Sequence, residues 1–306
     1  MEGFGRFLVY RLVRILIALW AVVTVVFIVM RLSGDPVPLL LPPDAPIAEM
    51  EQLRHEMGLD RPILVQYGVF FSQAIRGNFG RSIHFRTSAM QVTWERVPAT
   101  LELAFTSFVC AIVVAVPAGI ISAMKRGSTY DNVVMGAALV GQAAPSFYLG
   151  IMLILTCSLW LGLFPTSGRG EWRQLVLPSI TLGAFAMASI ARITRSAMLE
   201  TLRADFIRTA RAKGLSESCT IAKHAMRNAA IPIITIVGLQ LGNLLGGAVV
   251  TETIFSWPGI GRLAIQSIFA RDYPVVQSCV FMTAVMFVIL NCLVDIAYGL
   301  LDPRIR

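Results

Sequence analysis

The chain has 306 residues, of which 56% are hydrophobic and only 14% are charged, and its mean hydropathy is +0.71. These values exclude an ordinary soluble globular protein and indicate an integral membrane protein. The formal net charge of +8 does not point to nucleic acid, because the basic residues flank apolar runs and therefore fit a role in membrane topology.

Six stretches without charged residues predict six transmembrane helices, because a span needs roughly 20 apolar residues. The stretches are residues 15–30, 103–124, 132–168, 174–191, 228–251 and 273–294. The first follows a basic N-terminus without a small-residue cleavage site, so it is expected to be a retained span and not a signal peptide. The third is too long for one straight span, and Pro145 predicts a kink near its start. The predicted fold class is an all-α integral membrane protein.

A long segment after the first span is expected on the outer side. The chain then divides into the N-terminal tail and first span (1–31), this outer segment (32–97) and a five-helix core (98–306). Two short helices are predicted in the outer segment, around Ile47–Met57 and Ile63–Ile75. The second fits a helix on the membrane surface. Its three aromatic residues are Tyr67, Phe70 and Phe71.

The distribution of basic residues predicts the orientation in the membrane. With the N-terminus in the cytoplasm, most arginines and lysines fall on the inner side, including eight from Arg192 to Arg227, in keeping with the positive-inside rule. Both termini are then cytoplasmic. An interfacial belt predicts tryptophans at span ends, and four fall at outer ends in this arrangement. They are Trp94, Trp160, Trp172 and Trp257.

Motifs for catalysis and nucleotide binding are missing from the chain. The sequence contains no GxxxxGK[ST] loop for ATP and no GxSxG elbow. The histidines His55, His84 and His224 are too scattered for a metal site. The chain is therefore expected to be no enzyme and to hold no cofactor or metal of its own. Energy for any transport must come from an ion gradient or from a partner protein.

Two carboxylates lie about one turn inside predicted spans, Glu102 in the second and Asp295 in the sixth. A carboxylate within the membrane is a functional candidate. Each also fits an interfacial residue that pairs with a neighbouring arginine.

A basic, helix-forming loop, residues 198–228, connects the fourth and fifth predicted spans. Asp205 to Lys213 contains neither Gly nor Pro and predicts a short helix. Gly214 then fits a left-handed residue after the helix end, and Ser216 fits the cap of a second helix with Glu217 in its first turn. The small residues Ala210 and Ala212 would let a partner approach closely. An amphipathic connector on anionic lipid fits the same pattern.

The segment Thr209-Ala210-Arg211-Ala212-Lys213-Gly214 resembles the cytoplasmic signature of the membrane subunits of binding-protein-dependent ABC importers, in the form of the peptide and nickel branch. Arg208 stands where that signature has a glutamate, so a glutamate-based contact is not carried over. The interval from Gly214 to Pro232 is also longer than in the compact signature. Further segments resemble the same branch along nearly the whole chain. They are Gly34–Pro36, Gly58–Pro62, Gly77–Ser82, Pro98–Leu103, Phe255–Gly259 and Leu301–Arg304.

The resemblance is greatest to the first of the two permease subunits of a dipeptide or oligopeptide system. It implies a homologous second permease, two cytoplasmic ABC ATPase subunits that bind ATP and magnesium, and an extracytoplasmic substrate-binding protein, at a bacterial inner membrane. The loop that couples the chain to the ATPases would then consist of Asp205, Arg208, Thr209, Ala210, Ala212, Lys213, Gly214, Leu215 and Ser216. Dipeptides, longer peptides, glutathione, opines and nickel chelates are all substrates of this branch.

Two other functions fit the hydropathy pattern. One is a gradient-driven secondary transporter that works alone, and the other is a structural membrane scaffold. An internal repeat would favour the secondary transporter, and the six predicted spans do not fall into two similar halves.

The fifth predicted span carries Gly238, Gly242 and Gly246 at intervals of four residues, which lets helices approach closely. This stripe fits tight packing within the subunit or a seam with the second permease that lines the pathway. Gln240 and Asn243 are candidates for contacts with peptide backbone or for interhelical hydrogen bonds. The outer loop 252–272 is expected to form an ordered turn at the mouth of the molecule. Its gate residues would be Trp257, Pro258 and Gly259.

Overall fold

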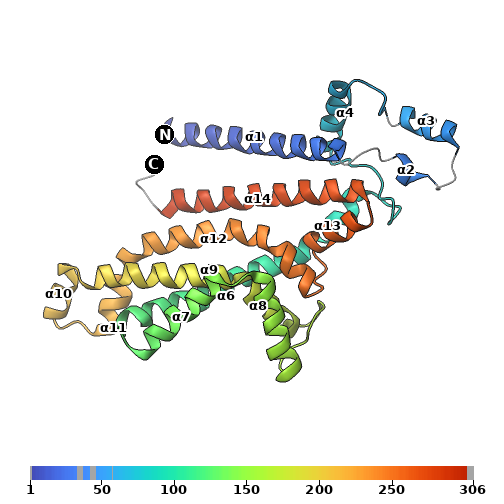
Figure 1. Ribbon diagram of the computed structural model, residues 1–306. Coiled ribbons are helices and arrows are strands. Elements are labelled where there is room, and N and C mark those ends of the chain that lie inside the picture. The colour runs from blue at the N-terminus through green and yellow to red at the C-terminus, as the bar shows by residue number, and fades with distance from the viewer. Residues whose placement is uncertain (1, 33–36, 42–45, 57, 302–306) are drawn as a thin grey trace. The chain divides into compact units, whose positions relative to one another are not determined.

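The structure is a computed structural model that describes residues 2–32, 37–41, 46–56 and 58–301 (Figure 1). These residues form helices and no strand; the only sheet-like feature among them is an isolated bridge between Arg81 and Ser88. The predicted all-α fold is therefore confirmed. Met57, Gly34–Pro36 and Asp302–Arg304, which the sequence analysis singled out, lie outside the described residues.

The chain forms two compact units, residues 1–98 with 259–289 and residues 99–258 with 290–306. The helices of unit 1 are α1 (Glu2–Leu32), α2 (Val37–Leu40), α3 (Ile47–Glu56), α4 (Ile63–Ile75), α5 (Ala89–Trp94), α13 (Ile260–Phe269) and most of α14 (Tyr273–Leu301). Those wholly or mainly in unit 2 are α6 (Val97–Met124), α7 (Thr129–Ala143), α8 (Ser146–Leu153), the π-helix η1 (Ile154–Trp160), α9 (Trp172–Leu202), α10 (Asp205–Ala212), α11 (Glu217–Cys219), the π-helix η2 (Thr220–Ala225) and α12 (Met226–Ile254).

Four helical stretches of the described residues are long and apolar enough to cross a membrane. They are Ala89–Met124, Trp172–Leu202, Glu217–Ile254 and Tyr273–Val294, and they contain the second, fourth, fifth and sixth predicted spans. The first predicted span lies in α1, whose apolar part Val13–Val29 is shorter. Because the third is a broken helix pair, the count of six spans stays a prediction.

The third predicted span is broken at Pro145, where α7 and α8 meet at an angle of 117°. Ala144 ends α7 in an extended conformation with ψ of 130°, as the residue before a proline prefers. The kink predicted at this proline is thus confirmed and is a full change of direction, since α8 leaves the line of α7 (Figure 1).

The core of unit 2 is built around α9, which packs against α7 and α12. Its contact with α6 depends on glycine. A Cβ atom at Gly119 would lie 2.6 Å from the carbonyl oxygen of Ala191, and one at Gly183 would lie 3.0 Å from that of Ser107. The absence of side chains lets these backbones approach closely, as small residues do in membrane helices.

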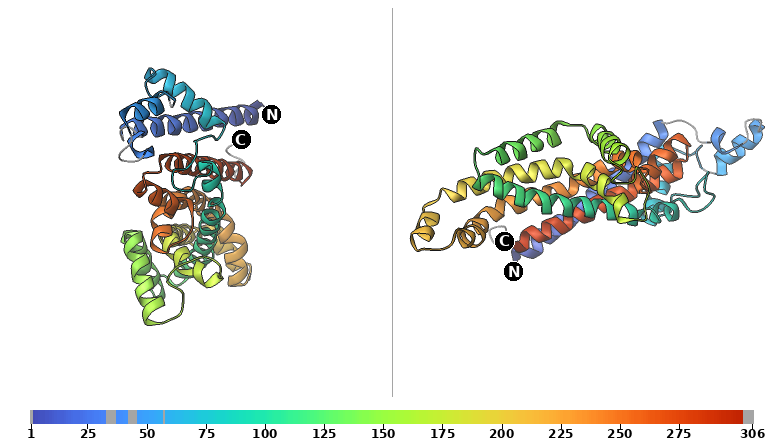
Figure 2. Two further views of the ribbon diagram at one scale, coloured as in Figure 1. Left: turned by 90° about the vertical axis from the view of Figure 1, so that its right-hand side faces the viewer. Right: turned by 90° about the horizontal axis from the view of Figure 1, so that it is seen from below.

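At one end of unit 2, α10 lies beyond the ends of α9 and α12 (Figures 1 and 2). A cluster of buried side chains fills this end and joins residues of α6, α9, α10, η2 and α12. Its buried members are Ala123, Ala197, Met198, Ile207, Ile221, Ala225, Ala229 and Ile233. The loop between α9 and α12 is therefore packed onto the spans and not suspended from them.

In unit 1, α3 and α4 confirm the two short helices predicted in the outer segment. The aromatic face of α4 packs against α1. The ring centroid of Phe27 lies 5.3 Å from that of Tyr67 and 5.7 Å from that of Phe70, and the hydroxyls of Thr24 and Tyr67 are 2.7 Å apart. These contacts leave the aromatic residues of α4 half-buried, and the position of this helix on the membrane surface stays a prediction.

The outer loop 252–272 contains a helix, α13, that the sequence analysis did not predict. Gly259 precedes it in an extended conformation, and Ile260, Leu263 and Ser267 are buried along one side. The Pro and Gly residues before α13 suggested a turn for the whole loop, whereas the turn ends at Gly259 and an amphipathic helix follows.

Candidate functional site

The predicted coupling loop has the predicted local structure. Helix α10 begins at Asp205, whose charge suits the helix N-terminus, and is followed by Gly214 with φ of +79°. Only glycine takes this left-handed conformation without strain. The hydroxyl of Ser216 accepts a hydrogen bond from the backbone N–H of Cys219 at 3.4 Å and so caps the next helix.

Helix α10 has a buried face and an exposed face. Ile207 and Ala210 are buried, whereas Phe206 remains 43% exposed. Ala210 is thus turned inward, and its part in a close approach by a partner stays a prediction. The predicted coupling residues on the exposed side are Asp205, Arg208, Thr209, Ala212, Lys213, Gly214, Leu215 and Ser216.

Phe206 is a residue that the sequence analysis missed. It is the one aromatic residue of α10, and it stays exposed beside polar and basic neighbours. A large apolar side chain on an otherwise polar surface is a common anchor for protein contacts. The sequence did contain a signal for this contact residue, because an aromatic side chain next to Asp205 is unusual in a charged loop.

An ion pair fixes the turn after α10. The guanidinium of Arg211 donates to both carboxylate oxygens of Glu217, with Nη2–Oε1 at 2.6 Å and Nε–Oε2 at 3.1 Å. These hydrogen bonds to Glu217 raise the pKa of Arg211. The two residues flank Gly214, and their bidentate pairing holds the two short helices at a fixed spacing.

The segment after this turn, η2, is a π-helix that leads directly into α12. The hydroxyl oxygen of Thr220 is buried there without a hydrogen-bond partner among the described residues. Short π-helical segments are frequent at functional sites. The irregular segment thus lies between the predicted coupling residues 205–216 and the fifth predicted span.

The predicted seam residues of α12 are divided between two environments. Gly242 and Gln240 are buried and Gly238 is half-buried, whereas Asn243 and Gly246 are exposed. A Cβ atom at Gly246 would meet nothing within 4 Å. Gly246 is therefore open to a neighbour, whereas Gly238 and Gly242 pack within the subunit.

A pocket of about 290 Å³ lies between α12, α9 and the break of α7 and α8. Its lining residues are Gly141, Ala144, Ser146, Leu149, Thr181, Leu182, Ala184, Phe185, Ala186, Gln240, Asn243, Leu244 and Gly247. The structure thus brings the two predicted amide side chains together with a helix break that the sequence analysis had not connected to them. Within the pocket, Asn243 Nδ2 donates to Gln240 Oε1 at 3.5 Å.

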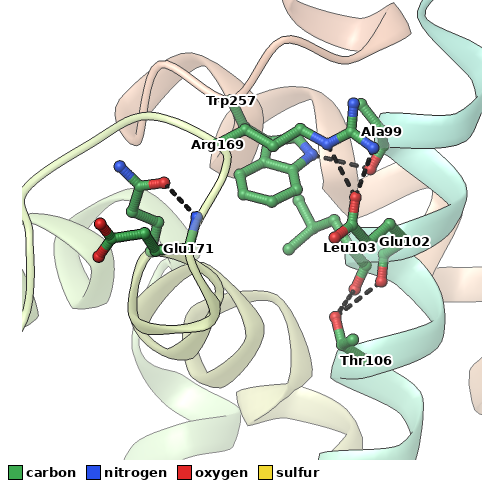
Figure 3. A network of polar contacts seen from close by, with 8 residues as sticks. Ala99, Glu102, Leu103, Thr106, Arg169, Glu171 and Trp257 are labelled. Atoms are coloured by element: carbon green, nitrogen blue, oxygen red, sulfur yellow. Dashed lines mark hydrogen bonds and ion pairs between the residues drawn. The ribbon is translucent and has the colours of Figure 1, made fainter.

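A polar cluster surrounds Trp257, the first predicted gate residue (Figure 3). Its indole N–H donates to the carbonyl oxygen of Ala99 at 2.8 Å, and the guanidinium of Arg169 lies 5.8 Å from the indole ring. Arg169 also forms an ion pair with Glu102 at 2.6 Å. Glu102 is therefore paired with an arginine, as one of its two interpretations stated.

Trp257 is fully buried, which corrects its assignment to an interfacial belt. Trp94, Trp160 and Trp172 are exposed, as a belt requires. The difference arises because Trp257 follows α12 in a turn that folds back onto α6. Pro258 is half-buried and Gly259 is buried, and the gate role of these three residues stays a prediction.

Two buried ionic groups escaped the sequence analysis. Glu252 is fully buried, and its Oε1 accepts a hydrogen bond from the hydroxyl of Thr100 at 2.6 Å. Asp131 accepts from Arg195 Nε at 2.6 Å and from Arg195 Nη2 at 2.7 Å. Glu252 could have been recognised as the first charge after the apolar run 228–251. The pair of Asp131 and Arg195 could not, because 64 positions separate its members in the chain.

The remaining side chains that could bind a metal ion do not form a site. In the described part of the chain, no three His, Cys, Asp or Glu side chains lie close enough to hold a metal ion. The side chain of Asp295, the second predicted membrane carboxylate, lies outside the described residues.

Two protein families match the chain. The family described as "Binding-protein-dependent transport system inner membrane component" matches residues 115–306. The family described as "Binding-prot-dependent transport system membrane comp, N-term" matches residues 4–104.

The glutathione transport system permease protein GsiC of Escherichia coli (strain K12) is 40% identical over 302 residues, which cover 98% of this chain and 99% of GsiC. GsiC of Shigella dysenteriae serotype 1 (strain Sd197) has the same identity and coverage. Similarity to these relatives thus extends over nearly the whole of both chains.

Solved structures share the fold. The MetNI methionine ABC transporter in an inward-facing conformation (CY5 native crystal form) gives a TM-score of 0.56 at 21% identity, covering 71% of this chain and 97% of that chain. Its SeMet soak crystal form gives 0.58 at 18% identity, covering 70% and 97%.

Proposed function

The chain belongs to the family of binding-protein-dependent transport system inner membrane components, and from this membership we propose that it is one of two membrane subunits of an ATP-driven importer for glutathione or short peptides. As a permease component of an ABC importer it is not an enzyme. Its proposed partners are a homologous permease, two cytoplasmic ATPase subunits and an extracytoplasmic substrate-binding protein. The proposed orientation has both termini in the cytoplasm.

The observation that carries this proposal is the two-faced structure of α10. Its exposed side offers Phe206, Arg208 and Thr209 to a partner, and its buried side places Ile207 in the cluster that joins α6, α9 and α12. A force on the exposed face would therefore reach three spans through packed side chains. Such side-chain contacts transmit displacement because protein interiors are densely packed.

In the proposed cycle, closure of the ATPase subunits moves α10, and the spans change the side from which the pathway is open. The bidentate hydrogen bonds between Arg211 and Glu217 connect α10 to α11 across Gly214, and the burial of Ile207 attaches α10 to the spans. The chain supplies no catalytic group in this cycle. Its contribution is a mechanical link and a path for the cargo.

An exposed stripe on α12 supports the proposed pathway. It carries the polar residues Thr235, Asn243 and Thr253 and the small Gly246 beside the exposed apolar residues Leu239 and Val250. Polar side chains in membrane helices usually face a protein interior or a water-filled cavity. We place this stripe at the pathway and at the seam with the second permease.

The cargo follows from the relatives. GsiC, at 40% identity along the whole chain, is a glutathione transport permease by name. Glutathione is a short peptide, which agrees with the peptide branch that the sequence resembles.

The proposal is tested with the full complex in proteoliposomes, using the second permease, ATPases and binding protein encoded beside this chain. Glutathione-loaded binding protein is expected to raise ATP hydrolysis and drive uptake. Gly214→Pro should abolish both while the complex stays assembled, because proline cannot take the φ of +79° and removes the N–H that donates to Arg211.

Gly162→Pro is the matched control. Gly162 also has positive φ and open space around it, but it lies in the loop after η1. Normal coupling in the Gly214→Pro complex would contradict the proposed role of α10. Uptake that survives ATP depletion and stops with an ionophore would instead favour a gradient-driven transporter.

A further inference from the structure

Three arginines of unit 1 lie at one loop on the proposed outer side of the molecule. Arg81 and Arg86 belong to loop 80–88, and Arg271 belongs to the turn between α13 and α14. We propose that these three residues, the outer arginine cluster, form a docking surface for an acidic face of the extracytoplasmic substrate-binding protein. This inference rests on the proposed function and on the proposed orientation in the membrane.

Hydrogen bonds within loop 80–88 close it into a compact structure. The backbone N–H of Ser82 donates to the carbonyl oxygen of Thr87 at 2.8 Å. Arg81 Nη2 reaches across the loop and donates to the carbonyl oxygen of Arg86 at 3.2 Å. The two arginines of the loop are therefore held next to each other.

Asp272 connects this loop to the start of α14. Its carboxylate accepts hydrogen bonds from the hydroxyl of Ser82 and, at 3.1 Å, from the backbone N–H of His84. Asp272 is only 1% exposed, so this contact is a buried anchor. Because Arg271 is the residue before Asp272, it lies beside loop 80–88, from which it is far apart in the sequence.

The outer arginine cluster is exposed and unpaired. All three residues are exposed, and in the part of the chain that the structure describes no carboxylate forms an ion pair with any of them. Phe85, which is 41% exposed, adds an apolar contact surface on the same loop. Arginine binds carboxylates through paired hydrogen bonds, and arginine and aromatic side chains are frequent anchors of protein interfaces. This surface thus fits an acidic protein partner.

The backbone of the cluster favours a folded partner over anionic lipid. Arg86 has φ of +57° and Arg271 has φ of +54°, a left-handed conformation that strains a residue other than glycine. The fold keeps both residues in fixed positions in spite of this strain. Side chains on a fixed backbone lose less entropy when they meet a rigid partner, whereas mobile lipid headgroups need no such fixed arrangement.

The test titrates glutathione-loaded binding protein against the full importer, in nanodiscs of neutral lipid and separately of anionic lipid, and measures affinity and ATP hydrolysis. Arg86→Glu should weaken binding about tenfold in both lipids, because it reverses a charge on the docking surface. Saturating binding protein should restore full stimulation of hydrolysis. Raising the salt concentration from about 50 to about 500 mM should weaken binding by wild type more than by the variant.

Arg76→Glu is the matched control for the change in charge. Arg76 is exposed at the end of α4, in the same unit but outside loop 80–88, and its variant should bind like wild type.

Arg86→Gly separates docking from folding, because glycine takes φ of +57° without strain. Its unfolding temperature should equal or exceed that of wild type, and its binding should still be at least about threefold weaker.

Unchanged affinity in both Arg86 variants, or an equal loss with Arg76→Glu, would overturn the docking surface. Loss of the second permease from the Arg86→Glu complex would overturn it too, because the cluster would then be a contact between permeases. A defect confined to anionic nanodiscs would assign the cluster to lipid headgroups instead.

The same titration separates this inference from the proposed function. If loaded binding protein raises ATP hydrolysis in wild type and the variants bind it equally well, the importer stands and only the docking surface is removed. If loaded binding protein fails to raise hydrolysis in wild type, the importer itself is contradicted.

Discussion

Asp131 and Arg195 form a buried ion pair, in which 3% of the Asp131 side chain and 23% of the Arg195 side chain are exposed. The carboxylate of Asp131 also accepts hydrogen bonds from the hydroxyl of Ser122 and, at 2.9 Å, from the N–H of Gly127. One side chain therefore joins the end of α6, the following turn, the start of α7 and the middle of α9. Removing one partner of such a pair leaves the other buried and uncompensated.

We expect Asp131→Ala to lower the free energy of unfolding by about 3–5 kcal/mol, because the partly buried guanidinium of Arg195 then loses the carboxylate that pairs with it. The measurement is unfolding of the purified subunit in mixed micelles. Glu200→Ala, at an exposed position of α9, is the control and should change stability by less than about 0.5 kcal/mol. Similar stability of the two variants would show that the buried pair is not an important structural link.

Glu102 and Arg169 form a contrasting pair, since each side chain is more than a third exposed. An exposed pair contributes roughly 0–1 kcal/mol to stability. The nearby buried contacts, Trp257 with Ala99 and Glu252 with Thr100, hold the start of α6 more firmly than this ion pair does. At the residue scale, burial decides which polar contacts hold unit 2 together.

Helix α10 has only eight residues, too few to be stable alone, so its position depends on packing. Ile207 supplies that packing, whereas Phe206 on the exposed side contributes little to the fold of the subunit. Adjacent residues thus serve separate purposes, one for attachment to the spans and one for the proposed contact with an ATPase.

Truncating these neighbours should separate the two purposes. Ile207→Ala is expected to destabilise the subunit by about 2–5 kcal/mol, because it opens a cavity in a buried cluster. Phe206→Ala should leave stability within about 0.5 kcal/mol and weaken retention of the ATPases by about tenfold. Thermal unfolding in detergent and co-purification of the ATPases measure the two effects.

Each variant is the other's control, because both remove a large apolar side chain from the same turn. Full retention of the ATPases by Phe206→Ala would contradict the docking face assigned to α10. An unchanged unfolding temperature for Ile207→Ala would contradict the attachment of α10 to the spans.

At the scale of the whole complex, the exposed stripe of α12 is the surface that we assign to the second permease. Gly246 lies on it, and a Cβ atom at this position would meet nothing within 4 Å. A larger side chain there is compatible with the fold of the subunit.

Gly246→Leu is therefore expected to reduce co-purification of the second permease at least about tenfold, since close helix approach requires small residues, without changing the stability of the subunit. Gly136→Leu on α7 is the control, because that position also has nothing within 4 Å. Equal loss of the second permease with both variants, or with neither, would remove Gly246 from the proposed seam.

The sequence by itself determined the features that depend on neighbouring residues. Apolar runs located the membrane helices, Pro145 located the break, and Gly214 with Ser216 located the turn of the predicted coupling loop. These follow from hydrophobicity and from backbone preferences, which act over a few positions. The family resemblance was also carried by contiguous motifs and was confirmed by the relatives.

Only the tertiary structure decided which side chains meet. It placed Trp257 in the core, turned Ala210 inward, paired Asp131 with Arg195 and brought Gln240 to the start of α8. Such contacts join residues far apart in the chain, and their formation depends on the packing of whole helices. The angle of 117° at Pro145 is of the same kind, because a proline permits a break but the surrounding helices set its direction.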